Sequence, residues 1–342
     1  MPKRPTISVV IPAHNAAPFI VETVRSVLAQ SRPPHEIIVV DDGSTDMDYG
    51  ILAKLDRLVN VVRQSQGGVS RARNAGCEVA SGECVAFLDA DDAWFPGKLE
   101  EQAVYLNANP NIAAVFTRGW LWRMSRDTWA WPNARLSELD PSATVVRYRD
   151  FILGIPASPS SIVIRKEILR SVGKFDETLS RGEDLDFYFR LSFNHITAVL
   201  HNRHVLYRRH EYNTTNKYCG YNAHADVIKR SVRTTGRIDA FGNSLSKSEL
   251  RRRLARIHFQ DGYGNFWSGN SLEAMKECAL SVALGGGLNA MAYCVASAVP
   301  GARGILKELK RHIGSQVEVE ESSEEALIEL PAEQLKSIPL NT

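Results

Sequence analysis

The chain has 342 residues, of which 44% are hydrophobic and 23% charged, a balance that excludes wholesale disorder and predicts a substantial buried core. Its net charge of +2 is unevenly distributed, because residues 315–342 hold seven glutamates and one lysine. The rest of the chain therefore carries 40 basic against 32 acidic side chains, a net charge of +8. This mild, dispersed excess suits an anionic small molecule such as a nucleotide diphosphate, or an anionic membrane surface, and argues against nucleic acid.

Five cysteines, an odd number, are widely spaced along the chain: Cys77, Cys84, Cys219, Cys278 and Cys294. They form no Cys-x-x-Cys pair, so they predict reduced thiols rather than a disulfide framework or a zinc site. Residues 1–5 lead directly into a predicted strand and contain no apolar signal-peptide core. These features together predict a cytoplasmic protein.

The first ninety residues alternate short apolar runs with segments of helical periodicity. The apolar runs are predicted strands at residues 6–11, 36–40, 59–63 and 84–88. The segments between them, at residues 18–30, 44–58 and 69–80, are predicted helices. This alternation predicts right-handed βαβ units and an α/β fold with a doubly wound, mainly parallel sheet.

The predicted strand at residues 84–88 ends in three carboxylates, Asp89, Asp91 and Asp92. Such positions lie at the carboxyl edge of the sheet, where open α/β sheets bind their ligands. Clustered carboxylates repel one another, so a divalent cation such as Mg²⁺ or Mn²⁺ is a natural reason to keep them together. For an isolated Asp-x-Asp the simpler interpretation would be a polar strand exit, with Asp92 capping a helix.

Two other predicted strands also end in polar loops, at residues 12–15 and 41–46. All three loops fall on the same edge of the sheet, which predicts a composite pocket and favours cation binding by the acidic cluster. Asp41 directly terminates a buried strand and is expected to face a ligand. Asp42 and Asp46 are expected to serve the turn itself.

Four segments occur in the order and spacing of family 2 glycosyltransferases: SVVIPAHN at 8–15, DDGSTD at 41–46, GGVSRARNAG at 67–76 and FLDADD at 87–92. The chain resembles that family over roughly residues 7–210. The resemblance implies the GT-A fold, a Rossmann-like, mainly parallel sheet with helices on both faces. It also implies an inverting transfer of a sugar from a nucleotide diphosphate donor.

The resemblance further implies that the first part of the chain binds this donor. Asp41 would hydrogen-bond the base (uracil is favoured), Asp89 would lie near the ribose, and Asp91 would hold a Mn²⁺ or Mg²⁺ ion that bridges the diphosphate. A guanidinium beside phosphate makes chemical sense for Arg73, although Arg71 is an equally basic neighbour. The donor-binding residues expected in this way are Pro12, Ala13, Asn15, Asp41, Gly68, Arg73, Asp89, Ala90 and Asp91.

The segment after the predicted strand at residues 112–117 is rich in tryptophan: Trp120, Trp122, Trp129 and Trp131. These residues show no period, so a role in the core or in a subunit contact is favoured over stacking on an acceptor sugar. Residues 148–159, rich in Pro and Ser, are expected to form a loop.

Glu183 and Asp184 open a predicted helix, where the helix dipole alone would favour acidic residues. The resemblance implies more, because the family places its general base at this Glu-Asp pair. An inverting transfer needs one carboxylate within hydrogen-bond reach of the acceptor hydroxyl. Asp184 is therefore expected to be the catalytic base, and Glu183 to bind the acceptor.

A strand predicted at residues 196–207 leads into His210. The resemblance places a histidine after this strand in the metal site, so Asp91 and His210 are the expected metal ligands. Imidazole is a less common ligand of Mg²⁺ than carboxylate but suits Mn²⁺. His201 and His204 are the alternatives.

The chain changes character after residue 221, where helical patterns replace the alternation. From residue 278 to residue 302 no side chain is charged, but Gly285–Gly287 and Pro300 interrupt this run, which argues against a membrane-spanning helix. Basic residues then surround Ile305, as in an interfacial amphipathic helix, although a soluble helical hairpin is favoured. We expect a GT-A nucleotide-sugar-binding and catalytic domain at residues 1–220, a helical region at 221–314 and an acidic flexible tail at 315–342.

The sequence thus predicts a metal-dependent, hexosyltransferase-like enzyme of polysaccharide biosynthesis, acting by single displacement on a hydroxyl of a glycan or lipid-linked acceptor. One rival, a nucleotidyltransferase acting on sugar phosphates, needs a Gly-rich basic loop after the first strand, which residues 12–15 do not supply. The other rival is a non-catalytic nucleotide- or glycan-binding module, and the candidate base argues against it. Peripheral association with the inner face of the membrane and a homo-oligomer remain open.

Overall fold

The computed structural model describes residues 4–123, 142–210, 223–313 and 327–329. Trp129, Trp131, Cys219 and all but three residues of the predicted acidic tail lie outside the described residues. The chain divides into two compact units. The sheet unit comprises the residues up to Arg147, Pro156–His210 and the residues from Glu324 onward, and the helical unit comprises Tyr148–Ile155 and Glu211–Ser323.

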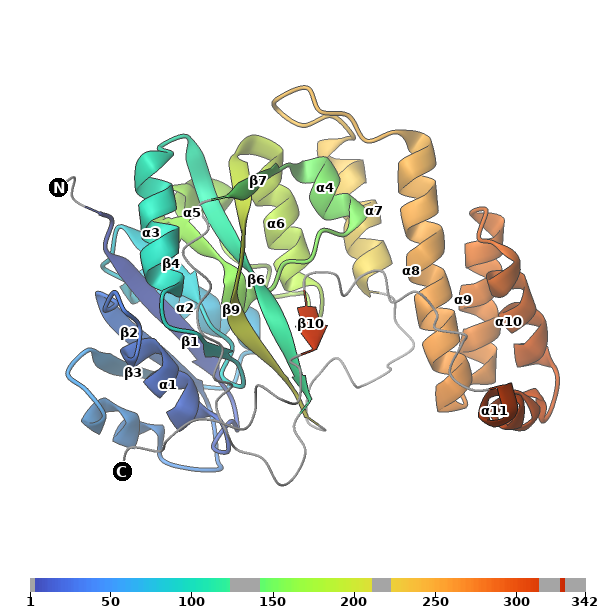
Figure 1. The fold of residues 1–342 in the computed structure, drawn as a ribbon, viewed down its shortest axis with the longest axis horizontal. Helices are drawn as coiled ribbons and strands as arrows, with labels where there is room; N and C mark the ends of the chain where they lie inside the picture. The colour runs from blue at the N-terminus through green and yellow to red at the C-terminus, as the bar shows by residue number, and fades with distance from the viewer. Residues whose placement is uncertain (1–3, 124–141, 211–222, 314–326, 330–342) are drawn as a thin grey trace. The chain divides into compact units, whose positions relative to one another are not determined.

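The sheet unit is organised around a ten-stranded sheet (Figure 1). Its order is β3-β2-β1-β4-β8-β6-β9-β5, with β7 paired to β9 and β10 paired to β6. The strands are β1 Ile7–Ala13, β2 Glu36–Asp42, β3 Val59–Gln64, β4 Cys84–Phe87, β5 Ala93–Trp94, β6 Ile112–Arg123, β7 Ala143–Val146, β8 Val163–Arg165, β9 Ile196–Arg209 and β10 Leu327–Glu329.

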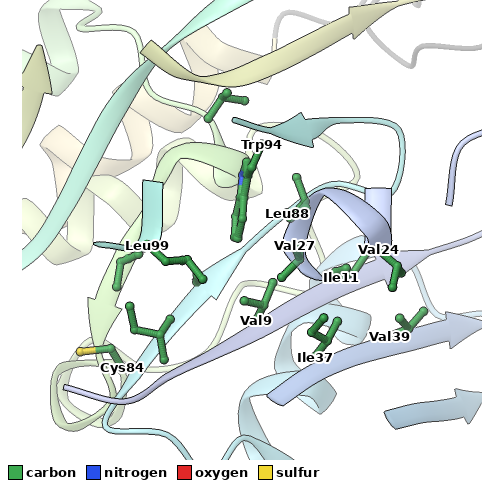
Figure 2. Packing of buried hydrophobic residues seen from close by; sticks show 14 of the residues in the cluster. Val9, Ile11, Val24, Val27, Ile37, Val39, Cys84, Leu88, Trp94 and Leu99 are labelled. Carbon is green, nitrogen blue, oxygen red and sulfur yellow. The ribbon is translucent and has the colours of Figure 1, made fainter. Parts of the chain in front are cut away.

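The first four strands pair in parallel, as the alternating pattern predicts. The elements that connect them are α1 Ile20–Leu28, the 3₁₀ helix η1 Tyr49–Lys54 and α2 Val69–Val79. One face of β1 and β2 packs against α1, and Figure 2 shows their apolar side chains interdigitating. The residues labelled there include Val9, Ile11, Ile37 and Val39 of the strands and Val24 and Val27 of the helix.

The other face of β1 receives α2 at very short range. A Cβ atom at Gly76 of α2 would lie 2.3 Å from Cγ1 of Val10, closer than side-chain atoms can approach. Gly76 therefore lets the helix backbone pack directly on the strand. This contact fixes the position of the helix that carries Arg73 relative to the sheet edge.

The second half of the sheet is mixed. β8 pairs antiparallel with both β4 and β6, whereas β9 runs parallel to β6. The helical elements of this half are α3 Lys98–Ala108, η2 Pro159–Ser161, α5 Lys166–Val172 and α6 Glu183–Asn194. Phe175 links α6 to β4, because its ring stacks on Phe187 (centroids 4.3 Å apart) and meets the edge of Phe87 (5.3 Å).

Of the two tryptophans of β6, one is buried in the core of the sheet unit and the other packs against it. Trp122 is buried in a small cluster with Phe95 and Leu206, and Trp120 packs against that cluster while partly exposed. The predicted core role therefore applies to Trp122.

One helix of the helical unit lies where the sequence predicted a loop. Residues 148–153, expected as a loop, form the short helix α4 Tyr148–Leu153, because Tyr148, Phe151 and Ile152 bury an apolar face of helical spacing. The other helices are α7 Ala223–Thr235, α8 Lys247–Ser268, α9 Ser271–Ala283, α10 Leu288–Ala298 and α11 Ala302–Ile313. None of the described helices combines the length and the apolarity that crossing a bilayer requires.

Candidate active site

The loop after β1 is fastened to the loop after β2. Asn15 donates its backbone N–H to Oγ of Ser44 (3.1 Å), and its Oδ1 accepts the N–H of Thr45 (2.9 Å). Asn15 adopts a left-handed backbone with φ of +49°, which asparagine tolerates better than most residues. His14 Nδ1 lies 2.8 Å from the carbonyl oxygen of Asp42. The two loops at this edge of the sheet thus form one structure.

β1 extends two residues beyond its predicted end at Ile11. The parallel register places Pro12 opposite Val40 and Ala13 opposite Asp41, and both residues are buried. The expectation of a loop beginning at Pro12 was wrong, because proline at this position keeps an extended backbone that pairs with β2. Of the predicted donor-binding residues in this stretch, Asn15 is the exposed one.

Asp41 is the second-to-last residue of β2, and 2% of the residue is exposed. Its Oδ1 accepts the backbone N–H of Ser44 (2.8 Å), and Nε of the exposed Arg63 lies 3.5 Å from its Oδ2. The carboxylate is therefore held in a fixed orientation at the point where β2 enters the polar loop.

Asp42 and Asp46 have structural roles, but they hold other loops rather than the turn in which they lie. Asp42 accepts the backbone N–H groups of Gly67 and Gly68, each at 2.8 Å, and so shapes the glycine-rich loop before α2. Gly68 has φ of +88°, a conformation that favours glycine. Asp46 accepts the backbone N–H of Ala17 at 2.8 Å.

Arg73 of α2 joins two acidic segments that lie far apart in the sequence. Its Nη2 lies 2.8 Å from Oδ1 of Asp89, and its Nη1 lies 2.9 Å from Oε1 of Glu183. The side chain is 3% exposed and lies over the ring of Phe175, with 5.4 Å from Cζ to the centroid. Arg71, the alternative arginine, is exposed.

The charges of this cluster act on one another. Burial alone would lower the pKa of Arg73, but the carboxylates of Asp89 and Glu183 outweigh it and raise that pKa. Burial raises the pKa of Asp89, and the charge of Asp91 adds to the rise, whereas Arg73 opposes it. The guanidinium therefore stays charged and compensates the carboxylates around it.

Asp92, the third carboxylate after β4, is 1% exposed and serves the scaffold. It accepts the hydroxyl of Ser160 (2.6 Å) and the backbone N–H of Arg208 (3.2 Å). The buried guanidinium of Arg208 in turn pairs with Glu22 of α1 at 2.7 Å. No sequence motif pointed to Ser160, Glu22 or Arg208, because each acts as a single residue outside any motif.

Asp91 lies close to His210, the histidine expected to join it as a metal ligand. Oδ2 of Asp91 lies 3.0 Å from Nε2 of His210, and their side chains are 30% and 10% exposed. The imidazole stacks on Phe19, just before α1, with ring centroids 4.4 Å apart. Phe19 therefore orients His210 toward Asp91. No sequence motif pointed to Phe19.

The two alternative histidines lie elsewhere in the contact network. His204 is buried against Glu101 of α3. His201 contacts the hydroxyls of Ser142 and Thr144, each at 2.9 Å. Of the three histidines, His210 is the one that the structure brings to Asp91.

Glu183 and Asp184 form the first turn of α6, entered through Gly182 with φ of +76°. Asp184 is half-buried, and its Oδ1 accepts the backbone N–H of Leu185 (2.8 Å). Burial, followed by the charge of Glu183, raises the pKa of Asp184 to about 7, although Arg73 works in the opposite direction. A carboxylate with this pKa exchanges protons efficiently near neutral pH.

The donor atoms of Asp91 and His210 fit a divalent cation in part. A carboxylate oxygen and an imidazole nitrogen suit Mn²⁺, and Mg²⁺ commonly binds through one or two carboxylates together with phosphates and water. Within the described residues, no three His, Cys, Asp or Glu side chains gather as a metal-ligand cluster. The pair is therefore compatible with a cation that is shared with a phosphate-bearing ligand.

The strand order and the acidic residues at the carboxyl edge of the sheet agree with the GT-A architecture that the resemblance implied. Residues 8–173 match the model of the glycosyl transferase family 2, so this part of the chain belongs to that family. The predicted family is thus confirmed.

Two curated relatives are similar over part of the chain. The putative teichuronic acid biosynthesis glycosyltransferase TuaG of Bacillus subtilis is 45% identical over 107 residues, which cover 30% of this chain and 42% of that protein. An uncharacterized glycosyltransferase of Rickettsia typhi is 31% identical over 219 residues, which cover 62% of this chain and 66% of that protein. The chain thus spans less than two thirds of the length of each relative.

Solved structures of Staphylococcus aureus TarS share the fold. TarS 1-349 in complex with UDP-GlcNAc superposes with a TM-score of 0.60 at 19% identity, over 90% of this chain and 92% of that chain. The same protein in complex with UDP gives a TM-score of 0.56 over 91% and 93%. This similarity confirms the predicted α/β architecture with C-terminal helices.

Proposed function

We propose that this protein is an inverting glycosyltransferase that moves a sugar from a nucleoside diphosphate to an acceptor hydroxyl in a single displacement. The acceptor oxygen forms a bond to the anomeric carbon while the bond from that carbon to the diphosphate breaks. The diphosphate leaves with the bonding electron pair, and Asp184 takes the hydroxyl proton. One base therefore suffices, and no covalent enzyme intermediate forms.

The observation that carries this proposal is the convergence of two acidic segments through one arginine. Arg73 holds Asp89, which follows β4, and Glu183, which opens α6, on the same guanidinium. Asp184 adjoins Glu183, so the candidate base lies beside the segment that contains Asp91. This is the proximity that a transfer between donor and acceptor requires.

The donor side rests on the loops after β1 and β2. Asp41, whose carboxylate accepts the backbone N–H of Ser44, would bind the base. The rest of the nucleotide would be surrounded by the Asp89-Ala90-Asp91 segment and by Pro12, Ala13, Asn15 and Gly68. A UDP-sugar is favoured, and the UDP-GlcNAc and UDP complexes of TarS support this choice. These roles remain proposals, since the similarity to TarS concerns the fold.

Asp91 and His210 would hold a divalent cation, Mn²⁺ or Mg²⁺. When bound, the cation would neutralise the charge that grows on the departing diphosphate. The contact between the two side chains and the stacking of His210 on Phe19 support this assignment.

The acceptor would be a glycan or a lipid-linked glycan, in keeping with the teichuronic acid biosynthesis named for the Bacillus subtilis relative. A cytoplasmic enzyme acting on such an acceptor would work at the inner face of the membrane. The helical unit supports this placement, because α10 exposes one apolar stripe, Leu288, Met291 and Val295, next in sequence to the basic helix α11. Ile305 of α11 is 63% exposed.

A screen of nucleotide sugars with Mn²⁺ tests the proposal. A preferred donor at 100 times its dissociation constant should stabilise the protein by about 2.7 kcal/mol in thermal unfolding. The same donor should be hydrolysed or transferred, and Asp91→Ala should abolish turnover. Stabilisation without turnover would indicate a binding module, whereas release of pyrophosphate from a nucleoside triphosphate and a sugar phosphate would indicate a nucleotidyltransferase.

A further inference from the structure

Arg73 is more deeply enclosed than a phosphate-binding arginine needs to be. Its side chain is 3% exposed, and both terminal nitrogens are engaged, one by Asp89 and the other by Glu183. The ring of Phe175 lies under the guanidinium. The next basic residue on the same helix, Arg71, is exposed instead.

We infer that Arg73 is a positioning residue that locks the donor segment and the acceptor segment of the site together. It does so by holding Asp89 and Glu183 on the two arms of one buried guanidinium. The inference rests on the proposed glycosyl transfer for its consequence in catalysis. It replaces the direct donor contact that the sequence suggested for this residue.

The energetics favour this role over phosphate binding. A guanidinium has five N–H donors, but this one is 3% exposed, so it would have to move away from at least one of its two partners to reach a diphosphate. That partner, with a side chain 27% exposed for Asp89 or 13% for Glu183, would then be a partly buried carboxylate without its counter-charge, near the carboxylates of Asp91 and Asp184. Breaking such an enclosed pair is strongly unfavourable, so the geometry keeps Arg73 between its two partners.

In the same arrangement, Arg73 acts electrostatically on Asp184, the proposed base. The charged or titratable groups that act on Asp184 are Glu183 and Tyr188 of its own helix, Arg73 of α2 and Asp89 after β4. Glu183 and Asp89 raise the pKa of Asp184, whereas Arg73 lowers it. Arg73 therefore favours the ionised form of the base and also holds the helix that carries it.

Three substitutions test the inference through the pH dependence of kcat. Arg73→Gln should lower kcat roughly 10- to 100-fold, as expected for a misplaced catalytic group, with less than a twofold change in the donor KM. The acid limb of the kcat–pH profile of this variant should move to higher pH by about 1 unit, because the substitution removes a positive charge beside the carboxylate of Asp184. Arg73→Lys should recover part of both effects, and Glu183→Gln should move the limb downward.

Arg25→Gln is the matched control, since Arg25 is exposed on α1 of the same unit and takes no part in the site. It should leave kcat, KM and the pH profile unchanged. If Arg73→Gln does not fold, as judged by circular dichroism, Arg73→Lys and Glu183→Gln still give opposite limb shifts. A large rise in donor KM with an unshifted limb in these Arg73 variants would overturn the inference and make Arg73 a donor ligand.

A measurement without turnover separates this inference from the proposed function. Carbon-13 NMR titration of aspartate-labelled protein, with Asp184→Asn to assign the signal, reports the pKa of Asp184 directly. The pKa should rise in Arg73→Lys or Arg73→Gln and fall in Glu183→Gln. Should the wild type transfer no sugar, the proposed function fails, while an unshifted Asp184 signal in all three variants would refute the role of Arg73.

Discussion

The carboxylates of the site differ in how the surrounding chain uses them. Asp42 accepts two backbone N–H groups of the glycine-rich loop, and Asp92 accepts a hydroxyl and a backbone N–H in the buried scaffold. Asp184 instead accepts one N–H from its neighbour Leu185 and lies in an enclosed acidic cluster. Burial raises the pKa of Asp92 as well as that of Asp184, so the partial exposure of Asp184, and not its raised pKa alone, distinguishes it as a candidate base.

Asp184→Asn should change the free energy of unfolding in a way that depends on pH. Because the pKa of Asp184 is about 7 in the folded state and lies above its unfolded value, the folded wild type loses stability as pH rises from about 4 to about 7. Each unit of that difference is worth about 1.4 kcal/mol. The variant should therefore be more stable relative to wild type at pH 8 than at pH 4.5.

Urea unfolding of both proteins at the two pH values measures this difference. Asp186→Asn on the same helix is the control, since Asp186 is paired with Arg190 at 2.8 Å and should show no gain at pH 8. An Asp184→Asn effect of equal size at both pH values would contradict the raised pKa.

For individual residues, the sequence predicted the role of a side-chain type better than it predicted how deeply each side chain is buried. The turn chemistry of DDGSTD predicted structural roles for Asp42 and Asp46, but within their own turn, whereas the two carboxylates hold Gly67, Gly68 and Ala17 of other loops. It could not separate Arg71 from Arg73, because burial arises when α2 packs on the sheet and α6 approaches from residues more than 100 positions away. Phe19 and Ser160 also act through contacts between residues far apart in the sequence and carry no local signal.

Among the elements, α2 sets the position of the site most directly. Gly76 permits its backbone to approach Val10 of β1, and Arg73 projects from the same helix to Asp89 and Glu183. The glycine-rich loop that opens α2 is held by Asp42. The sheet edge and the acidic cluster are thus coupled through one helix.

Gly76→Ala should destabilise the protein by about 1–3 kcal/mol, because the added methyl group would lie 2.3 Å from Val10 and force the helix outward. Val79→Ala, at an exposed position of the same helix, should cost far less. Denaturant unfolding compares the two variants. A Gly76→Ala protein as stable as Val79→Ala would show that the close approach is unimportant.

The alternation of the first ninety residues predicted β1 to β4 and their parallel pairing, since buried strands and amphipathic helices carry strong periods. Several elements escaped this logic, among them the helix predicted at residues 44–58, where the chain forms the six-residue 3₁₀ helix η1. β1 runs through Pro12 and Ala13, because pairing with β2 overrides the usual role of proline as a strand end. α4 was missed because Tyr148, Phe151 and Ile152 make a single turn of apolar contact, too short to show a period.

At the scale of the whole molecule, every described residue of the proposed site belongs to the sheet unit, and the helical unit has a separate apolar surface. Leu288, Met291 and Val295 lie on one exposed stripe of α10, with 82%, 52% and 61% of their surface accessible. The adjoining α11 sequence is basic around Ile305. An anionic lipid surface matches both properties.

The double variant Met291→Ser/Val295→Ser should lose co-sedimentation with vesicles that contain phosphatidylglycerol, while wild type binds them. Ile51→Ser, an exposed apolar change in the sheet unit, is the control and should bind like wild type. Light scattering of the same samples reports self-association. Equal sedimentation of wild type and the double variant, or a loss of mass without a loss of vesicle binding, would contradict the membrane placement.

The most direct measurement compares sugar transfer and donor binding in Asp184→Asn. With Mn²⁺ and the donor identified by thermal shift, the variant should bind the donor as tightly as wild type, because Asp184 faces the acceptor in the proposed reaction. Its kcat should fall by roughly 10²- to 10⁴-fold, the usual contribution of a general base. Wild-type turnover in Asp184→Asn would contradict a base at this position and, with it, the proposed mechanism.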